Sequence, residues 1–146
     1  MTLEQVKKKN RILIKYLNSI IDNYDVKAEY STNDENNRVI TVQEQSGERI
    51  VFYGDASPLY NYYSIIVYGL SIKENKEISV ELNELIGKSV LVEDTVVEDN
   101  KTYKETWQII FSQFTNFEPI EYLDIRRLGY NSTMKCIVNI VDRKEI

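Results

Sequence analysis

The sequence predicts an α+β fold in which a mainly antiparallel β-sheet carries a long N-terminal helix and a second helix packed on one face, plus a long β-hairpin. Apolar residues recur at helical spacing in two segments, residues 2–22 and 71–86, and the other segments are rich in β-branched and aromatic residues. The order is helix, several strands, helix, several strands, which is typical of α+β proteins. No repeat or linker interrupts the 146 residues, so we expect a single domain, 1–146.

The first helix is predicted to begin at Thr2. Gln5 lies three residues further on, and the two form a capping box in which each side chain binds the other's free backbone N–H. The apolar stripe that follows consists of Val6, Leu13, Leu17, Ile20 and Tyr24, widened by Ile14 and Ile21. A helix with this stripe should end near Asp22 or Asn23 and lie on a sheet.

Three short strands are expected after this helix. They are residues 26–30, 38–43 and 49–53. Residues 31–37 are all polar and turn-forming, so they predict a loop. Residues 44–47, which end in glycine, predict a short hairpin turn between the second and third of these strands.

The strand at the centre of the sheet is predicted to be residues 59–70, after a polar loop at residues 54–58. It has no charged residue and is rich in aromatic and β-branched residues. The side expected to face the core carries Tyr63, Ile65 and Val67. The other side carries Tyr62, Ser64, Ile66 and Tyr68. A strand that is apolar on both sides is covered on both, here by the chain's own helices and, on the other side, by what could be a neighbouring subunit.

The second helix is predicted over residues 71–86. Its apolar residues are Ile78, Leu82, Leu85 and Ile86. Gly87 is its expected C-terminal cap, because glycine readily adopts the left-handed conformation that ends many helices.

A long hairpin is predicted next, from residues 89–97 through a turn at residues 98–101 to residues 102–114. Its second strand places Trp107, Ile109 and Phe111 on one side. Strands this long exceed the usual five or six residues, so they could project as an arm that contacts a partner. The alternative is two ordinary sheet strands with longer ends.

The C-terminal part is predicted to contain one further strand, residues 130–141. Before it, residues 117–124 break the strand pattern at Pro119, and a connection runs through Arg126, Arg127 and Gly129. Cys136 alternates with core residues in this last strand and has no activating base nearby in the pattern. We therefore expect a buried structural thiol and not a nucleophile.

The net charge of −5 and the pI near 4.9 argue against a general nucleic-acid binder. One basic cluster is formed by Lys7, Lys8, Lys9, Arg11 and Lys15, and its spread around a helix favours a solvated face. The single cysteine excludes an intrachain disulfide and fits a reducing compartment. We expect neither a secretory signal nor a membrane span, since no apolar run approaches the ~20 residues that a span needs.

The residues of common catalytic sites are missing from the sequence. It has no histidine, which removes the usual general base and the usual transition-metal ligand, and its isolated glycines form no phosphate-binding loop. Paired carboxylates occur as Glu93 with Asp94, Glu98 with Asp99, and Glu118 with Glu121. Each pair lies in or beside a predicted turn, so these are expected to be solvated charges. We therefore expect no enzyme activity, no catalytic residue, no cofactor and no metal.

Two residue groups suggest contacts between subunits. Asp124, Arg126 and Arg127 could fix such contacts because arginine forks bind carboxylates or carbonyls in defined geometry, although a plain surface turn would look the same. The eleven tyrosines of the chain suit interfaces, or equally the packing of a sheet.

Two stretches of the sequence resemble the tail terminator proteins of long-tailed phages and of phage-derived contractile particles. The first contains VFYG at 51–54, IIVYG at 65–69 and the helix end LNELIG at 82–87. The second contains FEPIEYLD at 117–124, RRLG at 126–129 and VNIV at 138–141. In that family a long N-terminal helix precedes a small sheet, and an aspartate and arginine turn precedes the C-terminal strand.

The resemblance implies a structural protein that caps the tail tube as a closed ring, usually a hexamer, and forms the junction to the head connector or collar. The implied partners are other copies of the chain, the tail tube protein and connector, collar or sheath components, assembled in the cytoplasm of a host bacterium. DNA could pass through the lumen without specific binding. The expected subunit interface consists of Tyr60, Tyr62, Tyr68, Trp107, Asp124, Arg126 and Arg127. The expected lumen or ring surface consists of Glu93, Asp94, Glu98 and Asp99, whose charge would repel DNA.

Two other classes of function remain open on the sequence. One is a different tail or neck part, such as a head-completion protein, a tube subunit or an assembly chaperone. The other is a small-ligand-binding or enzymatic α+β domain, against which the absence of histidine and of glycine-rich loops weighs.

Overall fold

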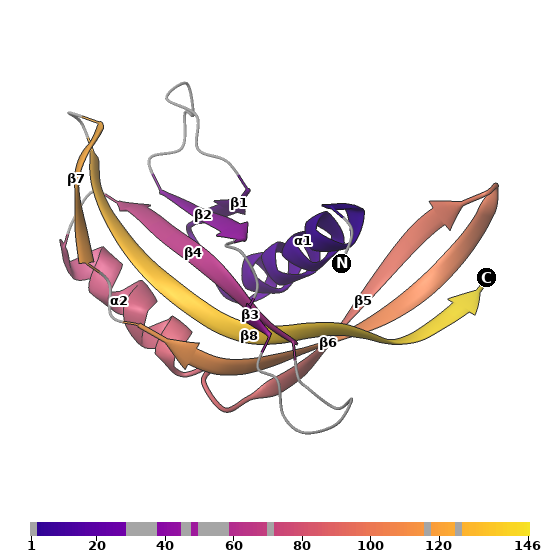
Figure 1. Cartoon of the computed structure of the whole chain (residues 1–146). Coiled ribbons are helices and arrows are strands. Elements are labelled where there is room, and N and C mark those ends of the chain that lie inside the picture. The colour runs from indigo at the N-terminus through magenta and orange to yellow at the C-terminus, as the bar shows by residue number, and fades with distance from the viewer. Residues whose placement is uncertain are drawn as a thin grey trace.

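The described part of the chain forms a curled sheet with two helices (Figure 1). The computed structural model describes residues 3–28, 38–44, 48–49, 59–69, 72–115, 118–124 and 127–146. The helices are α1 (Leu3–Ile20) and α2 (Ile72–Asn83). The strands are β1 (Asp25–Lys27), β2 (Val39–Glu44), β3 (Glu48–Arg49), β4 (Leu59–Gly69), β5 (Ser89–Glu98), β6 (Lys101–Phe114), β7 (Glu118–Asp124) and β8 (Arg127–Glu145).

The strands lie in the order β1-β2-β4-β8-β6-β5, with β3 paired to β4 and β7 paired to β8. Only the β1–β2 pair is parallel, and the other pairs of described strands are antiparallel. The predicted α+β class with a mainly antiparallel sheet is therefore confirmed.

Strand β4 occupies the middle of the sheet, between β2 and β8, as the sequence predicts. The side chains of Tyr63, Ile65 and Val67 are fully buried. On the opposite side Tyr68 is buried, whereas Tyr62 and Ile66 are only half-buried. The alternation of the strand thus directs one side wholly into the core.

Both helices contribute to the one apolar cluster that is built on this side of β4. The buried helix residues are Ile12, Leu13, Leu17 and Ile21 near α1 and Ile78, Leu82 and Leu85 near α2. The predicted stripe of α1 is wrong at Ile20, which is 38% exposed, while Ile12 is buried instead. Leu13, Leu17 and Ile21 stand four residues apart and define the buried line, and Ile20 lies to one side of it.

The C-terminal end of α1 is tied to the first strand by one side chain. Asn18 donates from Nδ2 to the carbonyl of Val26 at 2.9 Å and accepts from the Val26 N–H at 3.1 Å. Asn23 then takes a positive φ of 67°, a conformation that asparagine tolerates after a helix. The chain can therefore turn back and add β1 to the sheet.

The hairpin predicted between β2 and β3 is wrong for the described residues. Both strands pair antiparallel with β4, through Glu44 opposite Tyr63 and through Glu48 opposite Tyr60. Two strands that are antiparallel to the same strand run in the same direction, whereas the strands of a hairpin run in opposite directions. The third predicted strand continues past Arg49 into residues outside the described part of the chain.

The predicted break at Pro119 is also wrong, because residues 118–124 form β7. Among the described residues β7 pairs only with β8, so it is an edge strand, and proline, which cannot donate a backbone hydrogen bond, is tolerated there. The last strand is longer than predicted: β8 begins at Arg127 and ends at Glu145.

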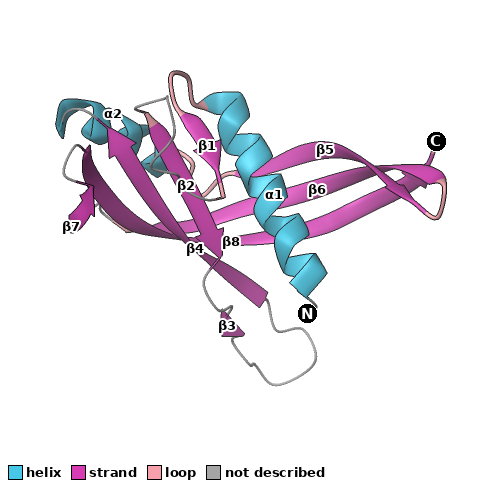
Figure 2. Ribbon diagram, turned by 90° about the horizontal axis from the view of Figure 1, so that it is seen from above, coloured by secondary structure: helices cyan, strands magenta, loops and turns pink. Residues whose placement is uncertain are grey.

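The long hairpin is confirmed, and it projects. Asp99 and Asn100 form its two-residue turn with positive φ values of 49° and 64°, the conformation of a tight hairpin turn. Figures 1 and 2 show β5, β6 and the end of β8 extending together beyond the rest of the sheet. Strand β8 makes its last described pair with β4 at Cys136 and continues alongside β6 to Glu145.

Candidate functional site: a projecting arm braced by the first helix

The projecting part is a ribbon of three strands, here called the arm: β5, β6 residues 101–110 and β8 residues 137–145. Strand β6 is the middle strand of the arm. Ile110 pairs with Ser89 on one side and Ile137 on the other, and Tyr103 pairs with Val96 and with Glu145. Among the described residues, the outer edge of β5 and the outer edge of this part of β8 have no strand partner. The arm therefore presents two open edges over the same length.

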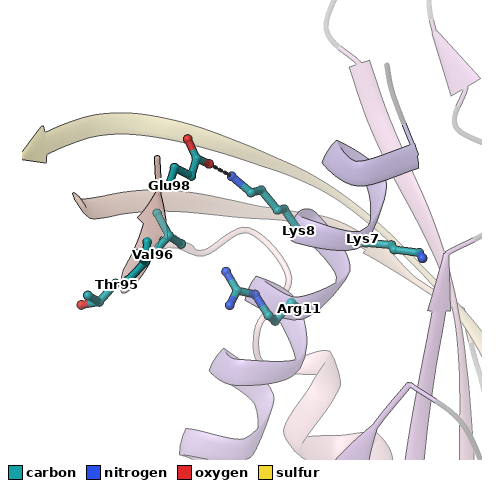
Figure 3. Close-up of a pocket in the computed structure, with 7 residues that line it drawn as sticks. Lys7, Lys8, Arg11, Thr95, Val96 and Glu98 are labelled. Atoms are coloured by element: carbon teal, nitrogen blue, oxygen red, sulfur yellow. Dashed lines mark hydrogen bonds and ion pairs between the residues drawn. The ribbon is translucent and has the colours of Figure 1, made fainter. Parts of the chain in front are cut away.

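Cationic side chains of α1 form ion pairs with acidic side chains of the arm. Lys8 forms an ion pair with Glu98 (Figure 3), in which Lys8 Nζ lies 3.0 Å from Glu98 Oε1, and Arg11 forms an ion pair with Asp94. Lys15 Nζ lies 3.5 Å from Asp94 Oδ1 and donates to the main-chain carbonyl of Glu93 at 2.6 Å. We call these contacts the brace.

A groove of about 420 Å³ lies between α1 and the far half of the arm. Its lining consists of Lys7, Lys8, Arg11, Thr95, Val96, Val97 and Glu98 (Figure 3). The basic cluster of α1 was predicted to be a solvated face. Arg11 and Lys15 are indeed about half exposed, but their charges are directed to acids of the arm.

Arg143 links all three strands of the arm. It pairs with Glu98 of β5, and its Nε lies 3.7 Å from Glu105 Oε2 of β6. Its guanidinium carbon lies 4.1 Å from the centre of the Tyr103 ring, within cation–π range. Glu105 is 1% exposed and accepts a hydrogen bond from Trp107 Nε1 at 3.4 Å. Sequence reasoning missed both Arg143 and Glu105, although Glu105 continues the inward alternation of Trp107, Ile109 and Phe111 in β6.

The pKa of the Glu98 carboxyl is held below its ordinary value by hydrogen bonds from Arg143 and Lys8. The pKa of Glu98 is lower in the folded chain than in the unfolded one. These contacts therefore make their full contribution to stability when the pH is above the ordinary pKa of 4.5. It is lost as the pH falls through the folded pKa. The tip of the arm should therefore loosen in acid.

We expect the protection factor of the Val96 amide, which faces β6, to fall relative to those of β4 as the pH is lowered below 4.5. Hydrogen exchange followed by NMR measures this. Glu98→Gln should remove the pH dependence, and Asp99→Asn, at the exposed turn, should retain it. Equal pH dependence in wild type and Glu98→Gln would contradict the assignment.

The predicted acidic residues all lie in the arm, in different surroundings. The Glu93 side chain is 66% exposed and lies 3.3 Å from Lys104 Nζ, whereas the Asp94 side chain is only 11% exposed beneath the α1 cations. Glu98 lies between Lys8 and Arg143, and Asp99 is exposed in the turn. The side chains of Asp94 and Glu98 thus take part in the brace. A role for the four residues on a lumen or ring surface stays a prediction.

Of the predicted interface residues, the structure describes the side chains of Tyr62, Tyr68 and Trp107. Trp107 and Tyr68 are buried within the chain, with 6% and 3% of their surface exposed, so they have little surface left for a neighbour. Tyr62 is half-buried, and Lys135 Nζ lies 5.6 Å from the centre of its ring. The structure describes the backbone but not the side chains of Tyr60, Asp124 and Arg127, and Arg126 lies outside the described residues.

Exposed apolar side chains, which the prediction did not include, occur mostly on the arm and at the C-terminus. They are Leu91, Val97, Ile140, Val141 and Ile146, with exposures of 66%, 70%, 43%, 51% and 75%. Only two other large hydrophobic residues of the described chain are exposed, Ile20 and Val80 on the helices. Leu91 is opposite Gln108 and Ile140 is opposite Trp107, so these two side chains lie on different faces of the arm. The exposed apolar residues therefore do not form one patch.

A second polar group lies under α1, where Lys9 and Glu44 approach the core. Burial lowers the pKa of Lys9 and raises that of Glu44, and the attraction between the two charges opposes both shifts. Burial also raises the pKa of the Cys136 thiol to about 12. A thiol with so high a pKa is a poor nucleophile, and Cys136 is buried as predicted.

Among the described residues, no three His, Cys, Asp or Glu side chains gather closely enough to hold a metal ion. Neither of the two described helices is long and apolar enough to cross a bilayer.

No protein-family model matches the chain, and no curated protein matches it in sequence. A proposal about function therefore depends on the geometry of the arm and on the resemblance in the sequence.

Proposed function

We propose that this chain is a structural protein of a phage tail or phage-tail-like particle, which caps the tail tube as a ring of identical subunits. The cap ends polymerisation of the tube and forms the junction to the head connector or collar. The resemblance to tail terminators supplies the class of particle and the expected sixfold ring. The chain acts in this proposal by binding other proteins and not by catalysis.

The observation that carries the proposal is the arm, with two open strand edges and exposed apolar residues. Open edges readily pair with another chain, and monomeric proteins usually cover, shorten or charge them. Leu91 and Val97 are about two-thirds exposed on β5, and burial of such side chains stabilises an assembly by roughly 25 cal/mol per Å². The brace fixes the direction of the arm before a partner binds, so less ordering free energy is lost on assembly.

A tube subunit is the second candidate, because an arm with two open edges also suits a protein that forms stacked rings. The two candidates differ in what the purified chain does alone. Rings of a tube subunit have self-complementary faces and stack into long tubes, whereas a cap forms at most one ring.

Assembly of tubes in the presence of this chain tests the proposal. We expect added chain to shorten the tubes that the tube protein of the same particle forms, and electron microscopy to show extra density at one tube end. Heat-denatured chain at the same concentration is the control. Long tubes formed by the chain alone would favour a tube subunit. Unchanged tube lengths with bare ends would contradict the cap, and the absence of tubes from the chain alone would then contradict the tube subunit as well.

A further inference from the structure

We propose that the open edge of β5 in one copy pairs in parallel with the open edge of β8 residues 137–145 in the next copy. The arms then form one continuous sheet around the ring. This inference rests on the proposed function, since it names the surface that joins the subunits of the cap.

The two edges match in length and in level. Strand β5 has ten residues, and residues 103–110 of β6 pair both with β5 and with the free part of β8. Thr95 and Lys144 illustrate the match, because both are opposite Lys104 of β6. When one arm lies beside another, an open edge of one therefore faces an open edge of similar length in the other.

The strand directions select a ring. Strands β5 and β8 are each antiparallel to β6, so they are parallel to each other. Rotational symmetry makes all arms of a ring point the same way along its axis. A junction between β5 of one copy and β8 of the next is then parallel, and it leaves one β5 edge and one β8 edge open until the ring closes.

The β5 edge is guarded against pairing by its acidic side chains but lacks other usual guards. It contains neither proline nor lysine, and its outward side carries the exposed Leu91 and Val97. The one guard that the described structure adds is Lys15, which binds the Glu93 carbonyl. Lys15 comes from α1, so an incoming strand would meet the brace and the groove beside it.

Charge selects β8 over a second β5 as the partner. Strand β5 carries three negative residues, Glu93, Asp94 and Glu98, and no positive one. Two β5 strands side by side would bring six carboxylates together. The free part of β8 is balanced, with Asp142 and Glu145 against Arg143 and Lys144, so it approaches β5 without this repulsion.

Paired cysteines test the junction in the full-length chain. Thr95→Cys and Lys144→Cys are combined in one variant, because both positions are exposed and share one face of the arm. Within one chain they are two strand spacings apart, roughly 9–10 Å, which exceeds the ~7 Å limit for a disulfide. A second variant with Thr95→Cys and Asp142→Cys covers the stagger between strands that a closed ring introduces. The buried Cys136 stays in place.

We expect mild oxidation of the concentrated protein to give a ladder of crosslinked species in at least one double variant. Each single-cysteine variant should stay monomeric on a denaturing gel. Crosslinked dimers in Thr95→Cys alone would mean that β5 pairs with β5, and no ladder in either double variant would mean that the edges do not meet. Both results would overturn the inference.

Charge placed on the edge gives an independent readout. Val97→Lys should abolish the ladder, whereas Val80→Lys, the same change at an exposed position of α2, should leave it unchanged. The inference and the proposed function can fail separately. If light scattering shows a ring but no ladder forms, the arm junction is wrong and the cap is not affected. If a ladder forms but tube lengths do not change, the cap is wrong and the arm junction is not affected.

Discussion

Leu17→Ala is expected to destabilise the protein by about 2–5 kcal/mol, because it removes a fully buried side chain from the contact between α1 and the sheet. Leu17 belongs to the apolar cluster that includes Tyr63 and Ile65 of β4. The neighbouring helix and strand cannot fully close the cavity that the substitution leaves. Urea unfolding followed by circular dichroism measures the loss.

Ile20→Ala is the matched control on the same helix. Its side chain is 38% exposed, so we expect a loss well below that of Leu17→Ala, on the order of 0.5 kcal/mol. The pair also tests the orientation of α1, since the sequence pattern placed both residues on the buried stripe. Equal losses for the two variants would mean that α1 is rotated about its axis relative to the described position.

Arg143→Ala is expected to raise hydrogen-exchange rates in the arm by about 10- to 100-fold while β4 keeps its protection. The substitution leaves Glu105 buried without its cation and removes one partner of Glu98. A buried carboxylate without a cation destabilises the strands that enclose it. Exchange measured residue by residue separates this local effect from global unfolding.

Two further variants are controls for the effect of Arg143→Ala. Lys144→Ala changes the next residue, whose side chain is 77% exposed, and should leave the rates unchanged. Adding Glu105→Gln to Arg143→Ala should restore part of the protection, because a neutral amide is less costly to bury than a carboxylate. If the double variant exchanges as fast as Arg143→Ala, the charge on Glu105 is not the cause.

The elements that the sequence predicted well are those with a strong local pattern. Strand β4 has an uncharged, alternating run, α1 has a long apolar stripe, and the β5–β6 hairpin has a polar turn between β-rich segments. In each, the residues that decide the structure are neighbours in the chain.

The wrong predictions fall where distant contacts decide the structure. Residues 44–47 have the composition of a hairpin turn, but β2 and β3 both pair with β4 and not with each other. Which strands pair is decided by tertiary contacts. Pro119 was interpreted as a break because proline weakens a central strand, yet β7 lies at an edge. Whether a strand is central or at an edge is set by the assembled sheet.

The brace could not be predicted because it joins residues far apart in sequence. Lys8 and Glu98 are 90 positions apart, and Arg11 and Asp94 are 83 apart. The cations were visible on α1 and the acids on the hairpin, but one sequence does not show which groups meet. Glu105 is different, because its inward position follows from the alternation of β6 and could have been deduced.

Strand β8 also gives the protein a mechanical property. It is one uninterrupted strand of 19 residues, roughly 60 Å at about 3.3 Å per residue, and it belongs to the body at one end and to the arm at the other. No loop separates the two parts, and the pairing of β8 with β6 is irregular at two places, at Val141 within the arm and at Ser112 of β6 near Cys136. A force applied at the tip should load the β4–β8 hydrogen bonds in shear, and the arm should transmit that force to the body as a stiff lever.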